Sequence, residues 1–245
     1  MKMTLLHFCT LAFCVASVAA QAQEMQIPAG AIVRTSNCTI TDDRLTFDDV
    51  LERARQLNFG ENAPNLIFFR RPIYVSNQYA ADFQVAGYYS SYSEMFDRRV
   101  ALGTNSGGQL PVICDEAQVR RMVPVNNGDG LDDTSIMTTR FCSLNEGNSL
   151  RGVINRMQDV TENYERDAGN TTLVQIYTQG LGGDVDPPWD FMMAEVGTNR
   201  QELAERLDLA REGYRGGRGN GWSLGGFSCT RRALWSTNRV YSANN

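Results

Sequence analysis

Beyond residue 22 the chain contains neither histidine nor lysine. Its one histidine, His7, and its lysine, Lys2, both lie in the N-terminal segment. The remainder therefore offers no histidine general base, no Ser-His-Asp or Cys-His nucleophile and no lysine Schiff base. It also lacks the imidazole that would ligate haem or complete a His-containing zinc site. These absences exclude several common classes of enzyme.

The chain also lacks a long apolar run after its first residues. Residues 1–22 combine Lys2, an apolar stretch over 5–18 and small residues ending in Ala20-Gln21-Ala22, with cleavage after Ala20 as the alternative. This pattern is typical of a secretory signal peptide and is too short for a transmembrane helix. We therefore expect an exported protein, periplasmic or secreted, without a membrane span.

Positive charge is scarce. Without Lys2, 22 of the 23 basic residues remain against 28 acidic ones, a formal charge of 22 − 28 = −6. This charge argues against nucleic-acid binding, which needs a basic surface. The arginine- and glycine-rich run over 215–222 is interpreted as a long connection before the last strand. If it is functional, Arg215 and Arg218 would fold over an anionic ligand, which makes them candidate ligand-binding residues.

Six cysteines are present, and Cys9 and Cys14 would leave with the signal peptide. An even number in an exported chain predicts two disulfides. An internal repeat, described next, favours Cys38 with Cys114 and Cys142 with Cys229. The crossed alternative joins Cys38 to Cys142 and Cys114 to Cys229. Because the cysteines lack close CxxC spacing, we expect neither a metal site nor a cofactor.

The repeat consists of two stretches that resemble each other in order and spacing. Residues 34–40 and 47–53 correspond to residues 138–144 and 150–156, with a turn one residue shorter between them. Residues 82–86 correspond at identical spacing to residues 190–194. Each of these two stretches is followed by an acidic and then a basic residue in matching places. We therefore predict repeats over 23–125 and 136–245, joined by an acidic Gly/Asn linker over 126–135.

Hydrophobic periodicity gives each repeat the order β-α-β-β-α-β. Expected strands cover 32–40, 65–75, 83–89 and 112–123, then 137–144, 172–177, 191–196 and 227–241, the last as a long strand or hairpin. Expected helices cover 46–57, 93–102, 149–164 and 200–211, the last capped by Thr198. This order is the split βαβ, or ferredoxin-like, unit, an α+β fold in which the first and last strands lie side by side.

Two tandem ferredoxin-like units resemble the dimeric α+β barrel superfamily, in which two such halves pack around a central cavity. The resemblance covers about residues 30–242 and rests on element order and duplication. It implies one pseudo-two-fold barrel in a single chain. The superfamily includes cofactor-free monooxygenases, haem proteins and small-molecule binders, so the fold leaves the function open.

Several side chains are expected near such a cavity. Arg70 and Tyr74 follow two aromatic residues in one strand, Gln175 and Tyr177 lie in its counterpart, and Trp189 follows two prolines. Aromatic residues with a few polar groups are typical of a small-molecule site, and arginine binds carboxylates and phosphates. The alternative is that the aromatic residues fill the core and the arginines face solvent. We take Arg70, Tyr74, Gln175 and Trp189 as candidate ligand-binding residues.

Asp82 and Asp190 occupy matching places just before a strand in each repeat. Such a pair would act as acid and base, or would hold a polar ligand on the pseudo-two-fold axis, and Tyr177 is a further candidate catalytic residue. The alternative is that each aspartate satisfies a local turn.

Three functions remain. The first is an exported small-molecule-binding protein, the second a cofactor-independent oxygenase or isomerase, and the third a structural or assembly protein. The oligomeric state does not follow from the sequence.

Overall fold

The computed structural model describes residues 30–76, 79–98, 102–104, 108–126, 133–183, 186–212 and 226–243. Ten strands and four helices follow one another along this part of the chain. The strands are β1 (Ala31–Ile40), β2 (Leu66–Tyr74), β3 (Phe83–Tyr89), β4 (Val112–Cys114), β5 (Gln118–Pro124), β6 (Thr134–Leu144), β7 (Leu173–Gln179), β8 (Phe191–Gly197), β9 (Phe227–Cys229) and β10 (Ala233–Ser242). The helices are α1 (Phe47–Arg55), α2 (Tyr92–Asp97), α3 (Leu150–Ala168) and α4 (Arg200–Arg211).

The strands form a closed antiparallel barrel. The order is β10-β2-β3-β1-β5-β7-β8-β6, and β6 also pairs with β10, which closes the circle. Eight strands make the wall, while the short β4 and β9 extend the ends of β1 and β6. Closure leaves no long unpaired strand edge in this wall. The predicted mixed α and β composition around a barrel is confirmed.

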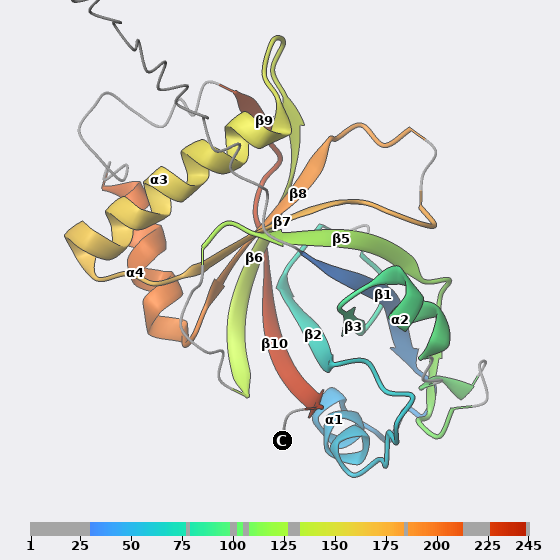
Figure 1. Ribbon diagram of the computed structural model, residues 1–245. Helices are drawn as coiled ribbons and strands as arrows, with labels where there is room; N and C mark the ends of the chain where they lie inside the picture. The colour runs from blue at the N-terminus through green and yellow to red at the C-terminus, as the bar shows by residue number, and fades with distance from the viewer. Residues whose placement is uncertain are drawn as a thin grey trace, which may run out of the picture.

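The barrel closes because the two halves of the chain exchange strand pairings. β5 pairs with β1 of its own half and with β7 of the other. In the same way β10 pairs with β6 and with β2. In Figure 1, α3 and α4 lie together on one side of the barrel, and α1 and α2 lie on the other.

Four apolar clusters make up the core of the described residues, and the smallest joins Met95 of α2 to Ile32, Tyr89 and Val119. Phe47, Val50 and Leu51 of α1 pack on the outer face of β2 with Ile67 and Phe69. The outer face of the other half packs in the same manner against α3. A third cluster fills part of the barrel interior, and its members include Val33, Ala86, Met137, Tyr177, Met192, Val196 and Trp235. Successive residues of a strand therefore face the helices and the barrel interior in turn, and residues two apart share one of these faces.

Both disulfides have the pairing that the repeat favoured. Cys38 joins Cys114 and Cys142 joins Cys229, each pair of residues lying directly opposite in register. The crossed alternative is excluded. Each bridge ties the first strand of a half to the strand that returns to it.

Some element boundaries differ from expectation. The strand predicted over 112–123 is interrupted at 115–117, and the last strand likewise divides into β9 and β10. α2 ends at Asp97, earlier than predicted, and α3 continues to Ala168. The prediction of Thr198 as a helix cap is wrong, because the Asn199 side chain accepts from the Glu202 N–H instead.

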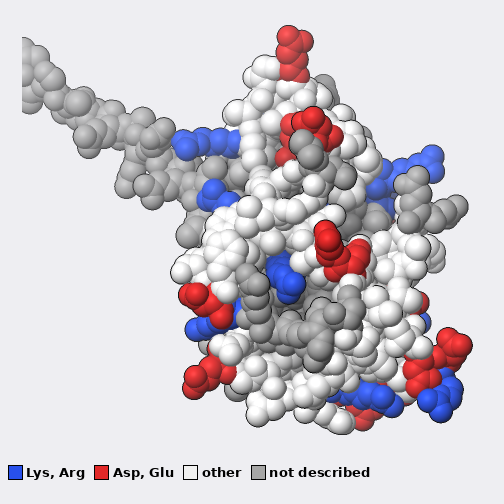
Figure 2. Space-filling view, turned by 90° about the vertical axis from the view of Figure 1, so that its right-hand side faces the viewer, with Lys and Arg blue, Asp and Glu red and all other residues white. Residues whose placement is uncertain are grey.

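Residues 127–132 of the predicted linker and residues 1–29, with the signal peptide, lie outside the described residues. Within the described part, no helix is long and apolar enough to cross a membrane. On the face in Figure 2, acidic and basic side chains are scattered and do not gather into one basic patch.

Candidate functional site

A hydrogen-bonded bridge of polar side chains crosses the barrel interior. In the closed strand order, β2 and β7 are four strands apart in either direction and so lie on opposite walls. Arg70 of β2 donates from Nη2 to the Tyr88 hydroxyl at 2.6 Å. The Tyr88 hydroxyl lies 3.2 Å from the hydroxyl of Tyr177 on β7. The bridge thus links the two walls through β3, on which Tyr88 lies.

The bridge has further partners at each end. Tyr177 donates to Gln175 Oε1 at 2.7 Å, and Arg70 Nη1 donates to Gln84 Oε1 at 3.0 Å. Arg70 is only 3% exposed and Tyr177 only 1%. The sequence therefore identified three members of this network, Arg70, Gln175 and Tyr177, which the fold brings together.

Arg70 is a buried cation whose hydrogen-bond partners are all neutral. Within the described residues it makes no ion pair, and its Nε is buried without any hydrogen-bond partner. Burial works against its charge, but the nearby hydroxyl groups of Tyr88 and Tyr177 raise the pKa of Arg70. The guanidinium therefore stays charged, and an uncompensated buried charge is costly to the folded state.

The phenol of Tyr177 stays protonated. Burial raises the pKa of Tyr177 well above its ordinary value, and neighbouring Tyr88 raises it further, which outweighs the opposite influence of Arg70. At neutral pH the Tyr177 hydroxyl is therefore a hydrogen-bond donor and acceptor rather than an anion.

A first cavity of about 340 Å³ adjoins this bridge. Its polar lining includes Arg70, Tyr88 and Gln175. Apolar side chains line most of the rest: Ala31, Leu66, Phe68, Met122, Met137, Leu173 and Val196. A mainly apolar cavity with a few polar groups at one place is the usual form of a small-molecule site.

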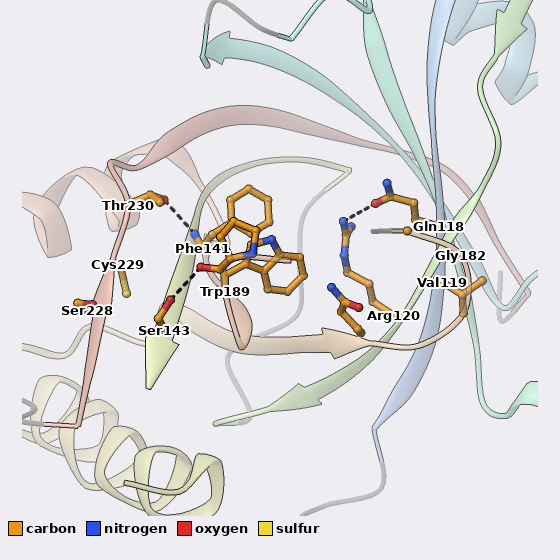
Figure 3. A pocket seen from close by; sticks show the side chains of 13 residues that line it. Gln118, Val119, Arg120, Phe141, Ser143, Gly182, Trp189, Ser228, Cys229 and Thr230 are labelled. Atoms are coloured by element: carbon orange, nitrogen blue, oxygen red, sulfur yellow. Dashed lines mark hydrogen bonds between the residues drawn. The ribbon is translucent and has the colours of Figure 1, made fainter. Parts of the chain in front are cut away.

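A second cavity of about 600 Å³ lies at the other end of the barrel. It is lined where β6 and β7 end, whereas the first cavity is lined where they begin. Figure 3 shows Trp189 and Phe141 on one side of it and Gln118 and Arg120 on the other. Trp189, a predicted ligand-binding residue, thus lines a cavity different from that of Arg70.

The two candidate catalytic aspartates make matching local contacts. Asp82 Oδ2 accepts from the Ile40 N–H at 2.8 Å, and Asp190 Oδ2 accepts from the Leu144 N–H at 2.6 Å. Neither aspartate lines either barrel cavity. The geometry therefore fits the alternative interpretation, in which each carboxylate ties the turn before a strand to the neighbouring strand.

The remaining candidates lie away from the bridge. Tyr74, at the end of β2, is 72% exposed and lines neither cavity. Arg215 and Arg218 lie outside the described residues.

Sequence reasoning missed Tyr88, Gln84 and Arg120. The first two alternate with Ala86 along β3, and this spacing of two was the available signal for an inward face. Nothing in the local sequence of β5 separates inward Arg120 from Arg121.

The donor groups do not fit a haem held by histidine or a free thiolate. The described residues contain no histidine, and their four cysteines are all in disulfides. The described residues also hold no group of three or more His, Cys, Asp or Glu side chains able to bind a metal ion.

No protein-family model matches this chain, and no curated protein matches it either. Solved structures do resemble it. A mutant chlorite dismutase from Candidatus Nitrospira defluvii aligns with a TM-score of 0.50 at 10% identity, covering 86% of this chain and 93% of the other. A proposed monooxygenase from Lactobacillus acidophilus aligns with a TM-score of 0.48 at 9% identity, covering 86% and 95%. At such low identity, the first of these likenesses shows similarity of fold alone and nothing about activity.

Proposed function

We propose that this chain is an exported small-molecule-binding protein whose barrel interior holds an anionic ligand with an apolar body. The observation that carries the proposal is Arg70, a buried guanidinium beside a cavity and without an acidic partner in the described chain. A bound carboxylate or similar anion would supply the missing charge and an acceptor.

The lining of the first cavity suggests the shape of the ligand. Its acidic group would lie at Arg70, with the Gln175 side chain nearby as a neutral hydrogen-bonding group. Its body would lie against Phe68, Met122 and Leu173, where burial of apolar surface contributes about 25 cal/mol per Å². Cationic ligands would be repelled by the same guanidinium.

Two further parts of the proposal concern origin and location. The matching element orders and disulfides of the two halves support an arrangement of two tandem ferredoxin-like copies in one barrel. The two disulfides also suit the oxidising periplasm or extracellular space, to which the N-terminal segment would direct the chain.

A binding experiment tests the proposal. Native mass spectrometry of the mature protein from its own host would weigh any retained ligand, and calorimetry would compare octanoate with uncharged octanol as probes. We expect octanoate to bind more tightly than octanol, and Arg70→Met to weaken octanoate at least tenfold. Arg71→Met is the matched control, because the adjacent Arg71 side chain is exposed. Equal binding of octanoate by Arg70→Met and the wild type would contradict the proposal.

Thermal unfolding separates binding from a structural role of Arg70. Replacing Arg70 by an apolar side chain removes the cost of burying an uncompensated charge, which opposes the loss of its hydrogen bonds to Gln84 and Tyr88. We therefore expect Arg70→Met without ligand to unfold at or above the wild-type temperature. A marked loss of stability would mean that Arg70 serves the fold instead.

The second candidate is a cofactor-independent oxygenase or isomerase. The observation that favours it is the Tyr88–Tyr177 hydroxyl pair beside Arg70, because a guanidinium would stabilise an anion formed when a bound substrate loses a proton. Oxygen uptake or isomer formation by the wild type, lost in Tyr177→Phe, would favour this candidate over simple binding.

A further inference from the structure

The second cavity has one aromatic wall. The rings of Phe141 and Trp189 lie 4.9 Å apart between centroids and are tilted by 37°, and Phe141 is 37% exposed. Large aromatic side chains left open to a cavity of about 600 Å³ offer a flat surface for another ring.

This wall is held in place by hydrogen bonds. The Phe141 N–H donates to Thr230 Oγ1 at 3.1 Å. The Ser143 hydroxyl donates to the carbonyl of Pro188, next to Trp189, at 3.1 Å. Both bonds appear in Figure 3. The two rings are therefore positioned before any ligand arrives, which reduces the entropy lost on binding.

The opposite wall presents a cation with neutral partners. Arg120 Nη2 donates to Gln118 Oε1 at 2.6 Å, and Nη1 donates to Thr35 Oγ1 at 3.5 Å. Arg120 makes no ion pair within the described residues. The Val119 N–H between these two residues donates to the Leu181 carbonyl at 2.7 Å, which joins β5 to the segment after β7.

We propose that the second cavity is a binding site for a planar aromatic acid, separate from the Arg70 site. The ring would stack on Trp189 and Phe141, and the acidic group would pair with Arg120 across the cavity (Figure 3). Arginine pairs with carboxylates and sulfonates through parallel hydrogen bonds, and the aromatic wall selects against aliphatic acids. The bridge of Arg70, Tyr88 and Tyr177 lies between the two cavities.

The test uses 2-naphthoate and its neutral counterpart 2-naphthamide as probes of the mature protein. The indole N–H signal of Trp189 in a two-dimensional NMR spectrum, identified with Trp189→Phe, reports binding at this cavity directly. We expect naphthoate to shift this signal at concentrations at least tenfold below those needed for naphthamide. Arg120→Gln is expected to remove that preference.

Matched variants locate the effect. Arg121→Gln removes the same charge from the exposed neighbouring residue and is expected to change the naphthoate affinity less than twofold. Arg70→Met is expected to leave the Trp189 response to naphthoate intact. A failure of the proposed Arg70 site can therefore be distinguished from a failure of the proposed Trp189 site. The proposal is overturned if naphthoate leaves the Trp189 signal unmoved, or if naphthoate and naphthamide shift it equally. The comparison of naphthoate with naphthamide on the wild-type protein tests the proposal even if Arg120→Gln does not fold.

Discussion

The helices α2 and α4 occupy matching places in the two halves and begin in the same manner. Ser91 and Asn199 each accept from the N–H three residues on, at 3.1 and 3.0 Å. The residues three positions on, Glu94 and Glu202, accept from the Ser90 and Thr198 N–H groups at 2.5 and 2.7 Å. The start of each helix is therefore satisfied locally.

The two halves differ in the ion pair made by the arginine that lies four residues after each of these glutamates. Arg98 pairs with Glu94 at 2.9 Å, with the arginine side chain 40% exposed. The corresponding Arg206 pairs with Glu195 at 3.2 Å, and both side chains are 4% exposed. The first half has Gly87 where the second has Glu195, five residues beyond the matching aspartates, and a side chain at Gly87 would press on Pro64. The same local signal thus leads to a surface pair in one half and a buried pair in the other.

The largest expected effect concerns the disulfides, and it should be alike in both halves. The bridges close loops of similar length, with sequence separations of 76 and 87. Loop-closure entropy predicts a loss of roughly 4 to 5 kcal/mol for either one when its cysteines become serine. Chemical denaturation of Cys38→Ser/Cys114→Ser and Cys142→Ser/Cys229→Ser measures both. Very unequal losses would break the parallel between the halves.

The buried ion pair should be worth much more than the exposed one. Glu195 accepts from Arg206 and Arg232, so Glu195→Ala leaves buried arginine unpaired. We expect a loss of about 3 kcal/mol or more for Glu195→Ala. For the exposed Arg98–Glu94 pair, Arg98→Ala should cost no more than about 1 kcal/mol. Equal losses in urea unfolding would mean that burial does not distinguish the halves.

The same contrast predicts a dependence on pH. Burial alone would raise the pKa of Glu195, but Arg206, Arg140 and Arg232 overcome this and lower it to about 2. The folded-state pKa lies below the unfolded value of about 4.3. The ionised Glu195 side chain therefore makes its full contribution to the free energy of unfolding at pH values above about 4.3. It is lost as the pH falls towards about 2. Glu195→Gln should therefore show a shallower decline of stability between these values than the wild type, measured by thermal unfolding.

A smaller effect than those of the disulfides and the buried ion pair is expected at Asp82 and Asp190. Each carboxylate accepts from one backbone N–H, so Asp82→Ala and Asp190→Ala should each cost about 1 to 2 kcal/mol. Thermal unfolding measures this, with the exposed Asp97→Ala as a control. Unchanged stability together with lost turnover would instead restore the catalytic interpretation of this pair.

The order of elements was predictable because it is written in local patterns. The spacing of apolar residues gave α1 and α4 within a few residues of their bounds, and the internal repeat, with two cysteines in each copy, favoured the correct disulfide pairing. Helix ends were less predictable. Thr198 and Asn199 are both capable caps, and the choice depends on the residue at which the backbone turns into the helix.

The candidate site was predictable only in part. Arg70, Gln175 and Tyr177 stood out as polar or aromatic residues in predicted strands. Their link through Tyr88 was not visible, because it joins strands on opposite walls of a closed barrel. Tyr74 is a tyrosine in a predicted strand, as Tyr177 is, but it lies outside the barrel interior at the exposed end of its strand.

The sequence by itself determined the four-cysteine framework, the alternation of strands and helices, and the absence of histidine chemistry beyond residue 22. These follow from residue type and spacing along the chain. Only the tertiary structure decided that Arg70 is buried without an acidic partner among the described residues, that Trp189 faces Arg120 (Figure 3), and that Arg70 and Trp189 line different cavities. Such features depend on which strands meet when the barrel closes, and the pairing of β10 with β2 joins residues more than a hundred positions apart.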